Sequence, residues 1–148
     1  RAVGHVGRIQ LDGAVAGGKL IVVVGRTRCG AVAAAVNLHE SHQTALQSTG
    51  CDHLDVLVSE IQKSIPAVNQ RSAAGNIPPD REAFVDELAR HNVMRTLRYI
   101  RTESRSLARL EQEGRIAIVG GMYDVQSGSV EFFGGLPPLR QAKQETLG

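Results

Sequence analysis

A short apolar run near the start of the chain constrains the fold more than any other feature. Leu20–Gly25 is built almost entirely of aliphatic and β-branched residues, and an alanine-rich stretch, Ala31–Val36, follows after a few polar residues. An uninterrupted run of this kind is typical of a strand buried on both faces, as in a parallel sheet covered by helices. The sequence therefore predicts a strand, a tight loop and a helix in immediate succession, with Cys29 and Gly30 at the junction.

The next part of the chain predicts a helix between two irregular stretches. Residues 37–50 are polar and predict a loop or a frayed helical turn. Apolar residues at spacings of three and four then predict a helix over 54–65, with Asp52 placed to cap it and Pro66 ending the pattern. Residues 69–79, which include a Pro-Pro pair, predict a connector.

Two further helices are expected between this connector and the second apolar run. Asp80 is placed to cap a long helix whose apolar residues recur at helical spacing. A shorter helix restarts at Thr102 or Ser104 and stops at Gly114, a residue type that favours helix C-termini.

Strands close the predicted fold. Residues 115–120 form a second buried-strand pattern, and the turn at Ser127-Gly128 leads into a last strand over 130–133. Strands that alternate with helices indicate an α/β domain with a mostly parallel sheet covered by helices. We expect residues 1–136 to form this domain, incomplete at its N-terminus, and residues 137–148 to form a tail.

Composition narrows the class of protein. A chain of 148 residues with a formal net charge of +2 gives no electrostatic reason to expect nucleic acid as a partner. Two cysteines are too few for a disulfide framework, which favours a cytoplasmic protein. The longest apolar run is far shorter than the roughly 20 residues of a membrane span. The chain begins at Arg1 and not at methionine, so we expect a processed, trimmed or excised piece.

Several segments, in the same order, resemble the β-class carbonic anhydrases. Gly25–Val32 is similar to the family's Gly-His-x-x-Cys-Gly-Ala loop between a strand and a helix. Gly121–Val130 resembles its Gly-x-Tyr-Asp-x-x-x-Gly-x-Val segment, and Thr49–Leu54 resembles the version of the domain fused to sulfate-permease-type transporters. The resemblance implies a β-carbonic-anhydrase-like fold that here lacks its first strands.

The resemblance also implies a zinc cofactor, and the ligand positions of this chain depart from it. Family members bind zinc through a Cys on the first strand, a His, and the Cys three residues after that His. Here Arg26 occupies the position of the His, and a guanidinium has no lone pair for a metal. The family's Cys-x-Asp-x-Arg segment is absent, so Cys29 is the one matching ligand position. Cys29 is then either the remnant of a ligand site or a small residue buried at a helix start.

Other polar residues leave alternatives open. Arg26 and Arg28, with the backbone N–H groups from Gly30 onward, could bind a small anion at a helix N-terminus, or the two arginines could simply face solvent. A second group could hold a metal or lie on the surface beside a helix cap, and its spacing matches no standard zinc finger: His39, His42, Cys51 and His53.

Two functional hypotheses follow from these residues and the resemblance. The first is the family activity, zinc-dependent reversible hydration of CO₂ to bicarbonate, impaired or lost in this chain because of Arg26 and the absent segment. The second is a non-catalytic module that binds bicarbonate or another small anion, or that serves assembly or regulation. Under both hypotheses the resemblance implies a homodimer or a higher homo-oligomer, and no catalytic residue can be assigned.

Overall fold

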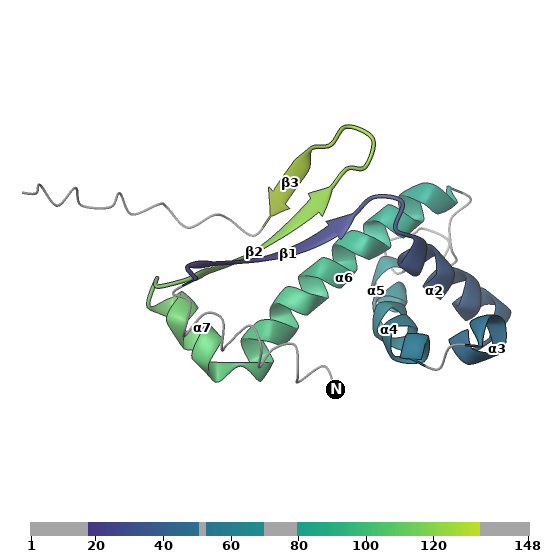
Figure 1. Ribbon diagram of the computed structural model, residues 1–148, viewed down its shortest axis with the longest axis horizontal. Coiled ribbons are helices and arrows are strands. Elements are labelled where there is room, and N and C mark those ends of the chain that lie inside the picture. The colour runs from purple at the N-terminus through teal and green to yellow at the C-terminus, as the bar shows by residue number, and fades with distance from the viewer. Residues whose placement is uncertain (1–17, 51–52, 70–79, 134–148) are drawn as a thin grey trace, which may run out of the picture.

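The computed structural model describes residues 18–50, 53–69 and 80–133, and its strands form one small sheet (Figure 1). Within these ranges the strands are β1 (Leu20–Arg26), β2 (Ala117–Tyr123) and β3 (Val130–Phe133), in the order β1-β2-β3. β1 and β2 run parallel, with Leu20 beside Ala117 and Arg26 beside Tyr123, whereas β3 returns antiparallel to β2. The predicted strands are present, and the described sheet is mixed, with one parallel and one antiparallel pair.

Helices lie on one side of this sheet and beyond its end (Figure 1). The long helix α6 (Arg81–Glu103) runs along the sheet, and α7 (Arg105–Gln112) turns back at its far end. A cluster of shorter helices gathers near the C-terminal end of β1, comprising α2 (Gly30–Ser41), α3 (Ala45–Thr49), α4 (His53–Gln62) and α5 (Ile65–Asn69).

The hydrophobic core lies between α6, the α2–α5 cluster and one face of the sheet. Leu88 of α6 is completely buried, and Ile118 and Met122 of β2 share the same cluster. Side chains alternate between the two faces of a strand, so Ile21 and Val23 of β1 also pack against this core.

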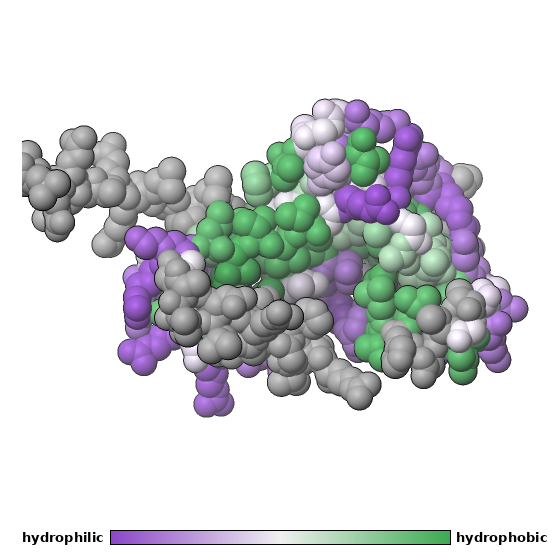
Figure 2. Space-filling model, in the orientation of Figure 1, coloured by the Kyte–Doolittle hydropathy of each residue, from purple (hydrophilic) through white to green (hydrophobic). Residues whose placement is uncertain are grey.

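The opposite face of the sheet is apolar (Figure 2). On this face Ala117 and Val119 of the central strand β2 are buried, whereas residues of β1, β3 and the end of β2 are exposed. Figure 2 shows hydrophobic residues gathered over β1 and β2 on the side turned to the viewer. Six large apolar residues alternate onto this face and keep between 38% and 54% of their surface exposed: Leu20, Val22, Val24, Tyr123, Val130 and Phe132. We call these six residues the open face of the sheet.

The predicted helix boundaries near the site are confirmed by their caps. The Asp80 carboxylate accepts a hydrogen bond from the Ala83 N–H at 3.0 Å, and the Ser104 hydroxyl accepts one from the Leu107 N–H at 3.2 Å. Gly114 has a positive φ of 65°, which explains why a glycine follows α7.

Elsewhere the boundaries differ from the expectation. Part of the predicted loop over 37–50 is helical, because α2 continues to Ser41 and Thr44 opens α3 with a capping box. The predicted helix over 54–65 ends earlier than expected, because α4 stops at Gln62. Pro66 lies instead in the first turn of α5, where the missing N–H costs little. Asp52, most of the 69–79 connector, the first seventeen residues and the predicted tail lie outside the described residues.

Candidate functional site

The loop after β1 is tied to the end of β2 by the side chain and backbone of Thr27. The Thr27 N–H donates to the Tyr123 carbonyl at 2.9 Å. Its hydroxyl accepts from the Val125 N–H at 3.1 Å and donates to the Asp124 carboxylate at 3.4 Å. These three contacts join segments almost a hundred residues apart in the sequence, so the Gly25–Val32 and Gly121–Val130 segments form one structural unit.

Asp124 organises the turn that follows β2. Its carboxylate accepts hydrogen bonds from the Gln126 N–H and the Ser127 hydroxyl, both at 2.9 Å. These two bonds stabilise the ionised form and hold the pKa of Asp124 below its ordinary value of 3.8. The Gly128 N–H closes the turn on the Asp124 carbonyl at 2.9 Å, as expected for the predicted hairpin.

Arg28 is held by groups that the sequence alone did not connect to it. It adopts the left-handed conformation, with φ of 52°, and its N–H donates to the Asp86 carboxylate at 2.7 Å. Its guanidinium pairs with the carboxylate of Glu82 and faces the Gln126 amide, whose oxygen is 2.7 and 2.8 Å from the two terminal nitrogens in the orientation that satisfies both groups. The predicted anion-binding residue Arg28 is therefore already paired.

Arg26 and Cys29 lie on the other side of the loop, in a hollow of ≈ 520 Å³. Arg26 is exposed, and among the described residues it pairs with no carboxylate. Cys29 precedes α2, its side chain makes no capping bond, and its free thiol is half-buried. Gly30 is the exposed first residue of α2. The hollow is otherwise mostly apolar, with lining residues from β1, α2, α4, α6 and the end of β2 that include Val23, Val32, Leu57, Ile61, Asn92, Val93 and Tyr123.

The described residues do not fit a zinc ion. Cys29 is the one thiol, imidazole or carboxylate residue among those that line this hollow, and catalytic zinc needs three protein ligands. No group of three or more such residues in the described ranges is arranged to hold a metal. His39 lies ten residues along α2 from Cys29, about 15 Å at helical rise, and His42 ends that helix. Cys51 and the side chain of His53 lie outside the described residues, so that metal hypothesis stays a prediction.

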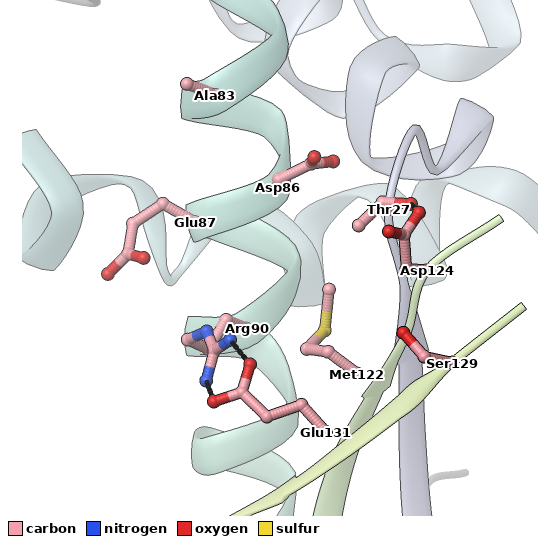
Figure 3. Close-up of a pocket in the computed structure, with 9 residues that line it drawn as sticks. All are labelled: Thr27, Ala83, Asp86, Glu87, Arg90, Met122, Asp124, Ser129 and Glu131. Carbon is pink, nitrogen blue, oxygen red and sulfur yellow. Dashed lines mark hydrogen bonds and ion pairs between the residues drawn. The ribbon is translucent and has the colours of Figure 1, made fainter. Parts of the chain in front are cut away.

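A second hollow, of ≈ 480 Å³, lies on the Thr27 side of the loop between α6 and the hairpin (Figure 3). Its lining carries four carboxylates and one guanidinium, that of Arg90, which binds Glu131 in a two-pronged ion pair (Figure 3). Arg90 also lies 5.0 Å from the centroid of the Phe133 ring. The carboxylates of this lining would repel an anion. The candidate anion site is therefore the hollow that Arg26 and Cys29 line.

Comparison with known proteins matches a stretch of the chain that contains both the Gly25–Val32 and the Gly121–Val130 segments. The family model for carbonic anhydrase matches residues 3–130, which is most of the chain. The chain belongs to the β-carbonic anhydrase family. It is 32% identical over 118 residues to carbonic anhydrase 1 of Escherichia coli O157:H7, a match that covers 78% of this chain and 47% of that protein. The chain thus spans about half the length of this curated relative.

Two solved β-carbonic anhydrases share the fold. The enzyme CafA of the fungal pathogen Aspergillus fumigatus has a TM-score of 0.63 and 25% identity, over 88% of this chain and 55% of that one. One of two tetrameric β-carbonic anhydrases from the filamentous ascomycete Sordaria macrospora has a TM-score of 0.72 and 18% identity, over 90% and 61%. These matches confirm the predicted family and the α/β fold. In the described part of this family member, no helix has the length and apolarity needed to cross a membrane.

Sequence reasoning found the loop of this β-carbonic anhydrase family member but missed its surroundings. Glu82 and Asp86 lie more than fifty residues from Arg28, and no spacing rule connects them to it. Leu57 and Ile61 follow the apolar pattern of α4, but Ile61 is 3% exposed whereas Leu57 is 48% exposed. The pattern did not predict that both would line the hollow beside Cys29.

Proposed function

We propose that this chain is a carbonic-anhydrase-family module that binds a small oxyanion such as bicarbonate at Arg26 and does not hydrate CO₂ by itself. The observation that carries the proposal is that Arg26 and Cys29 line the same hollow. Among the described residues, this hollow offers no metal ligand besides Cys29. A zinc ion, when bound in such enzymes, would lower the pKa of a water molecule to near 7. Nothing in the described lining of this hollow replaces that chemistry.

Charge supports an anion at this position. Arg26 is exposed and unpaired in the described ranges, whereas its neighbour Arg28 is neutralised by Glu82. The polar residues Asn92, Thr96 and Tyr123 also line the hollow, and its apolar wall would strengthen a charge-assisted hydrogen bond.

The second candidate is the family activity in a longer protein. Cys29 supports it, because its thiol is accessible from the hollow and is not used to cap α2. Zinc binding would then need the remaining ligands from residues outside the described ranges or outside this chain, together with a substitute for the imidazole at position 26. CO₂ and bicarbonate would be the substrates in that case.

Zinc content and CO₂ hydration separate the two candidates. We expect the purified chain to contain far less than one equivalent of zinc and to leave the hydration rate at its uncatalysed value, measured by stopped-flow pH change. Arg26→His restores one imidazole, and Arg28→His is the matched control on the same loop. Stoichiometric zinc together with hydration activity in the unaltered chain would refute the proposal and support the second candidate.

Bicarbonate binding tests the positive half of the proposal. Amide chemical shifts of Arg26, Cys29 and Gly30 should move on titration with bicarbonate. Arg26→Ala should weaken binding about tenfold, the usual worth of one charge-assisted hydrogen bond. Arg98→Ala removes another exposed arginine, on α6, and should leave binding unchanged. If Arg26→Ala and Arg98→Ala weakened bicarbonate binding equally, the binding would depend on the net charge of the protein and not on a site at Arg26.

We further propose that the module self-associates. The tetrameric relatives from Sordaria macrospora support this proposal, because their fold is shared over most of this chain. The open face of the sheet supports it as well, because an exposed apolar surface of this kind commonly marks an interaction site.

A further inference from the structure

Arg28 has a backbone conformation that its own side chain disfavours. Its φ of 52° lies in the left-handed region, where the Cβ of any L-residue comes too close to the following carbonyl oxygen. In the described ranges the one other non-glycine residue with a positive φ is His42, which ends α2, a place where this conformation is common. Arg28 lies before a helix and not after one, so other contacts must hold it in this conformation.

Two carboxylates of α6 supply these contacts. The Arg28 N–H donates to the Asp86 carboxylate at 2.7 Å, and the Arg28 guanidinium pairs with Glu82, one helical turn earlier. The Glu82 pair is about half exposed on both sides and contributes little. The bond to Asp86 has an ionised acceptor, which makes it strong, and it fixes the peptide plane that precedes Arg28. Figure 3 shows Asp86 reaching from α6 toward the loop that carries Thr27.

The left-handed turn decides which side chains of the loop share a hollow. Arg26 ends β1, and Thr27 continues the bonding to β2. Successive strand residues point to opposite sides, so Arg26 lines the hollow beside Cys29, whereas Thr27 lines the second hollow with its carboxylates. If the strand simply continued, the same alternation would place Cys29 on the side of Thr27. The turn at Arg28 breaks the alternation, and Cys29 lines the same hollow as Arg26.

We propose that Asp86 is a positioning residue of the candidate anion site, because it holds Arg28 in the left-handed conformation that keeps Arg26 and Cys29 on one hollow. The proposal rests on the anion site proposed at Arg26 and assigns the group that shapes it. Asp86 itself lines the second hollow, so it acts on the anion through the loop. α6 suits this role, because the helix that carries Asp86 also lines the anion hollow with Val93.

Removal of the Asp86 carboxylate separates a positioning role from an electrostatic one. Charge alone predicts tighter bicarbonate binding in Asp86→Ala, because the variant loses a negative charge near an anion site. A positioning role predicts the opposite sign. We expect binding to weaken about tenfold, because the loop that suits the anion becomes a minor population once Arg28 leaves the left-handed conformation. Amide chemical shifts during titration with bicarbonate give the affinities.

The matched control removes a carboxylate from the opposite end of α6. Glu103 lies seventeen residues after Asp86, about 25 Å along the helix. Glu103→Ala should change bicarbonate binding by less than about twofold, because salt screens a charge at that distance. If Asp86→Ala lowers the helical circular dichroism, Asp86→Asn takes its place in the comparison, since it keeps the shape of the side chain and weakens the bond.

Glycine at position 28 tests the mechanism. Glycine adopts a positive φ without penalty, so Arg28→Gly no longer needs the carboxylate to hold the turn. Adding Asp86→Ala to Arg28→Gly should therefore weaken bicarbonate binding by less than about threefold, against about tenfold in the arginine background. An equal loss in both backgrounds would overturn the proposal, and so would an Asp86→Ala variant that binds bicarbonate as tightly as the unaltered chain or more tightly.

A measurement without bicarbonate keeps this test separate from the proposed function. The N–H and Hα protons of a residue lie closest together at positive φ, so Arg28 should give a strong nuclear Overhauser effect between them. We expect this signal to weaken in Asp86→Ala and to persist in Glu103→Ala. An unaltered chain that binds no bicarbonate would refute the anion site at Arg26. A signal that persists unchanged in Asp86→Ala would refute the role of Asp86, whether or not the anion binds.

Discussion

Gly25, the first residue of the motif loop, leaves no room for a side chain. A Cβ added at this position would lie 2.7 Å from Met122 Sδ and 2.8 Å from Val93 Cγ2. Met122 is flexible and can swing aside, whereas Val93 is β-branched, stiff at χ1 and 4% exposed. The cost of Gly25→Ala is therefore set by the contact with Val93.

The expected size of the effect follows from two opposing terms. Overpacking of a core by one methyl group costs about 1–3 kcal/mol, and replacing glycine returns about 0.4–1 kcal/mol through the unfolded state. We expect Gly25→Ala to lower the free energy of unfolding by about 1–2 kcal/mol in urea titrations followed by circular dichroism. For a chain of this length that corresponds to about 3–8 °C in melting temperature.

Two further variants make this reasoning refutable. Gly30→Ala is the control, because a Cβ there meets nothing within 4 Å and alanine favours the start of α2. Val93→Ala in combination with Gly25→Ala should cost at least about 0.5 kcal/mol less than the sum of the two single changes, because the first change makes room for the second. A neutral Gly25→Ala, or strictly additive costs, would show that the close approach does not constrain the loop.

Three other predictions concern the scaffold. Leu88→Ala, at a completely buried position, should lower the free energy of unfolding by about 2–5 kcal/mol, whereas Leu46→Ala, 49% exposed, should stay within about 0.5 kcal/mol in the same titration. The hydrogen bonds from Arg101 hold the pKa of Glu111 below its ordinary value of 4.5, so the stability they add is present above that pH and is lost as the pH falls through the folded pKa. The gap between the urea midpoints of wild type and Arg101→Met should accordingly narrow as the pH falls below 4.5, and a constant gap would contradict the assignment. Thr27→Val should cost about 1–3 kcal/mol, because it leaves the backbone N–H that Thr27 accepts without a partner, and Thr27→Ser should recover most of that loss.

The comparison of sequence with structure separates local signals from long-range ones. Caps at Asp80 and Ser104 could be predicted because the capping side chain and the N–H that it accepts lie three residues apart. The end of β2 could not, because Gly120 and Gly121 weaken a strand pattern, and it is pairing with β1 and β3 that extends the strand to Tyr123.

At the candidate site, too, local features could be predicted from the sequence and long-range contacts could not. Arg26 and Cys29 were found because they stand in a short contiguous motif, whose match to the family fixed their expected roles. The pairing of Arg28 with Glu82 was not found, because it depends on where α6 crosses the loop. A resemblance transfers residue types at aligned positions, whereas the packing that determines their neighbours must be read from the fold.

The bonds between Thr27 and the segment after β2 have a consequence for the order of folding. A loop of nearly a hundred residues must close before Thr27 meets Val125, and long closures of this kind slow folding and come late. During synthesis, the Gly25–Val32 loop therefore emerges long before the residues that hold it. A truncation of the chain before Tyr123 would remove the hydrogen bonds that tie the loop of Arg26 and Cys29 to the end of β2. The candidate site therefore depends on the C-terminal part of the chain.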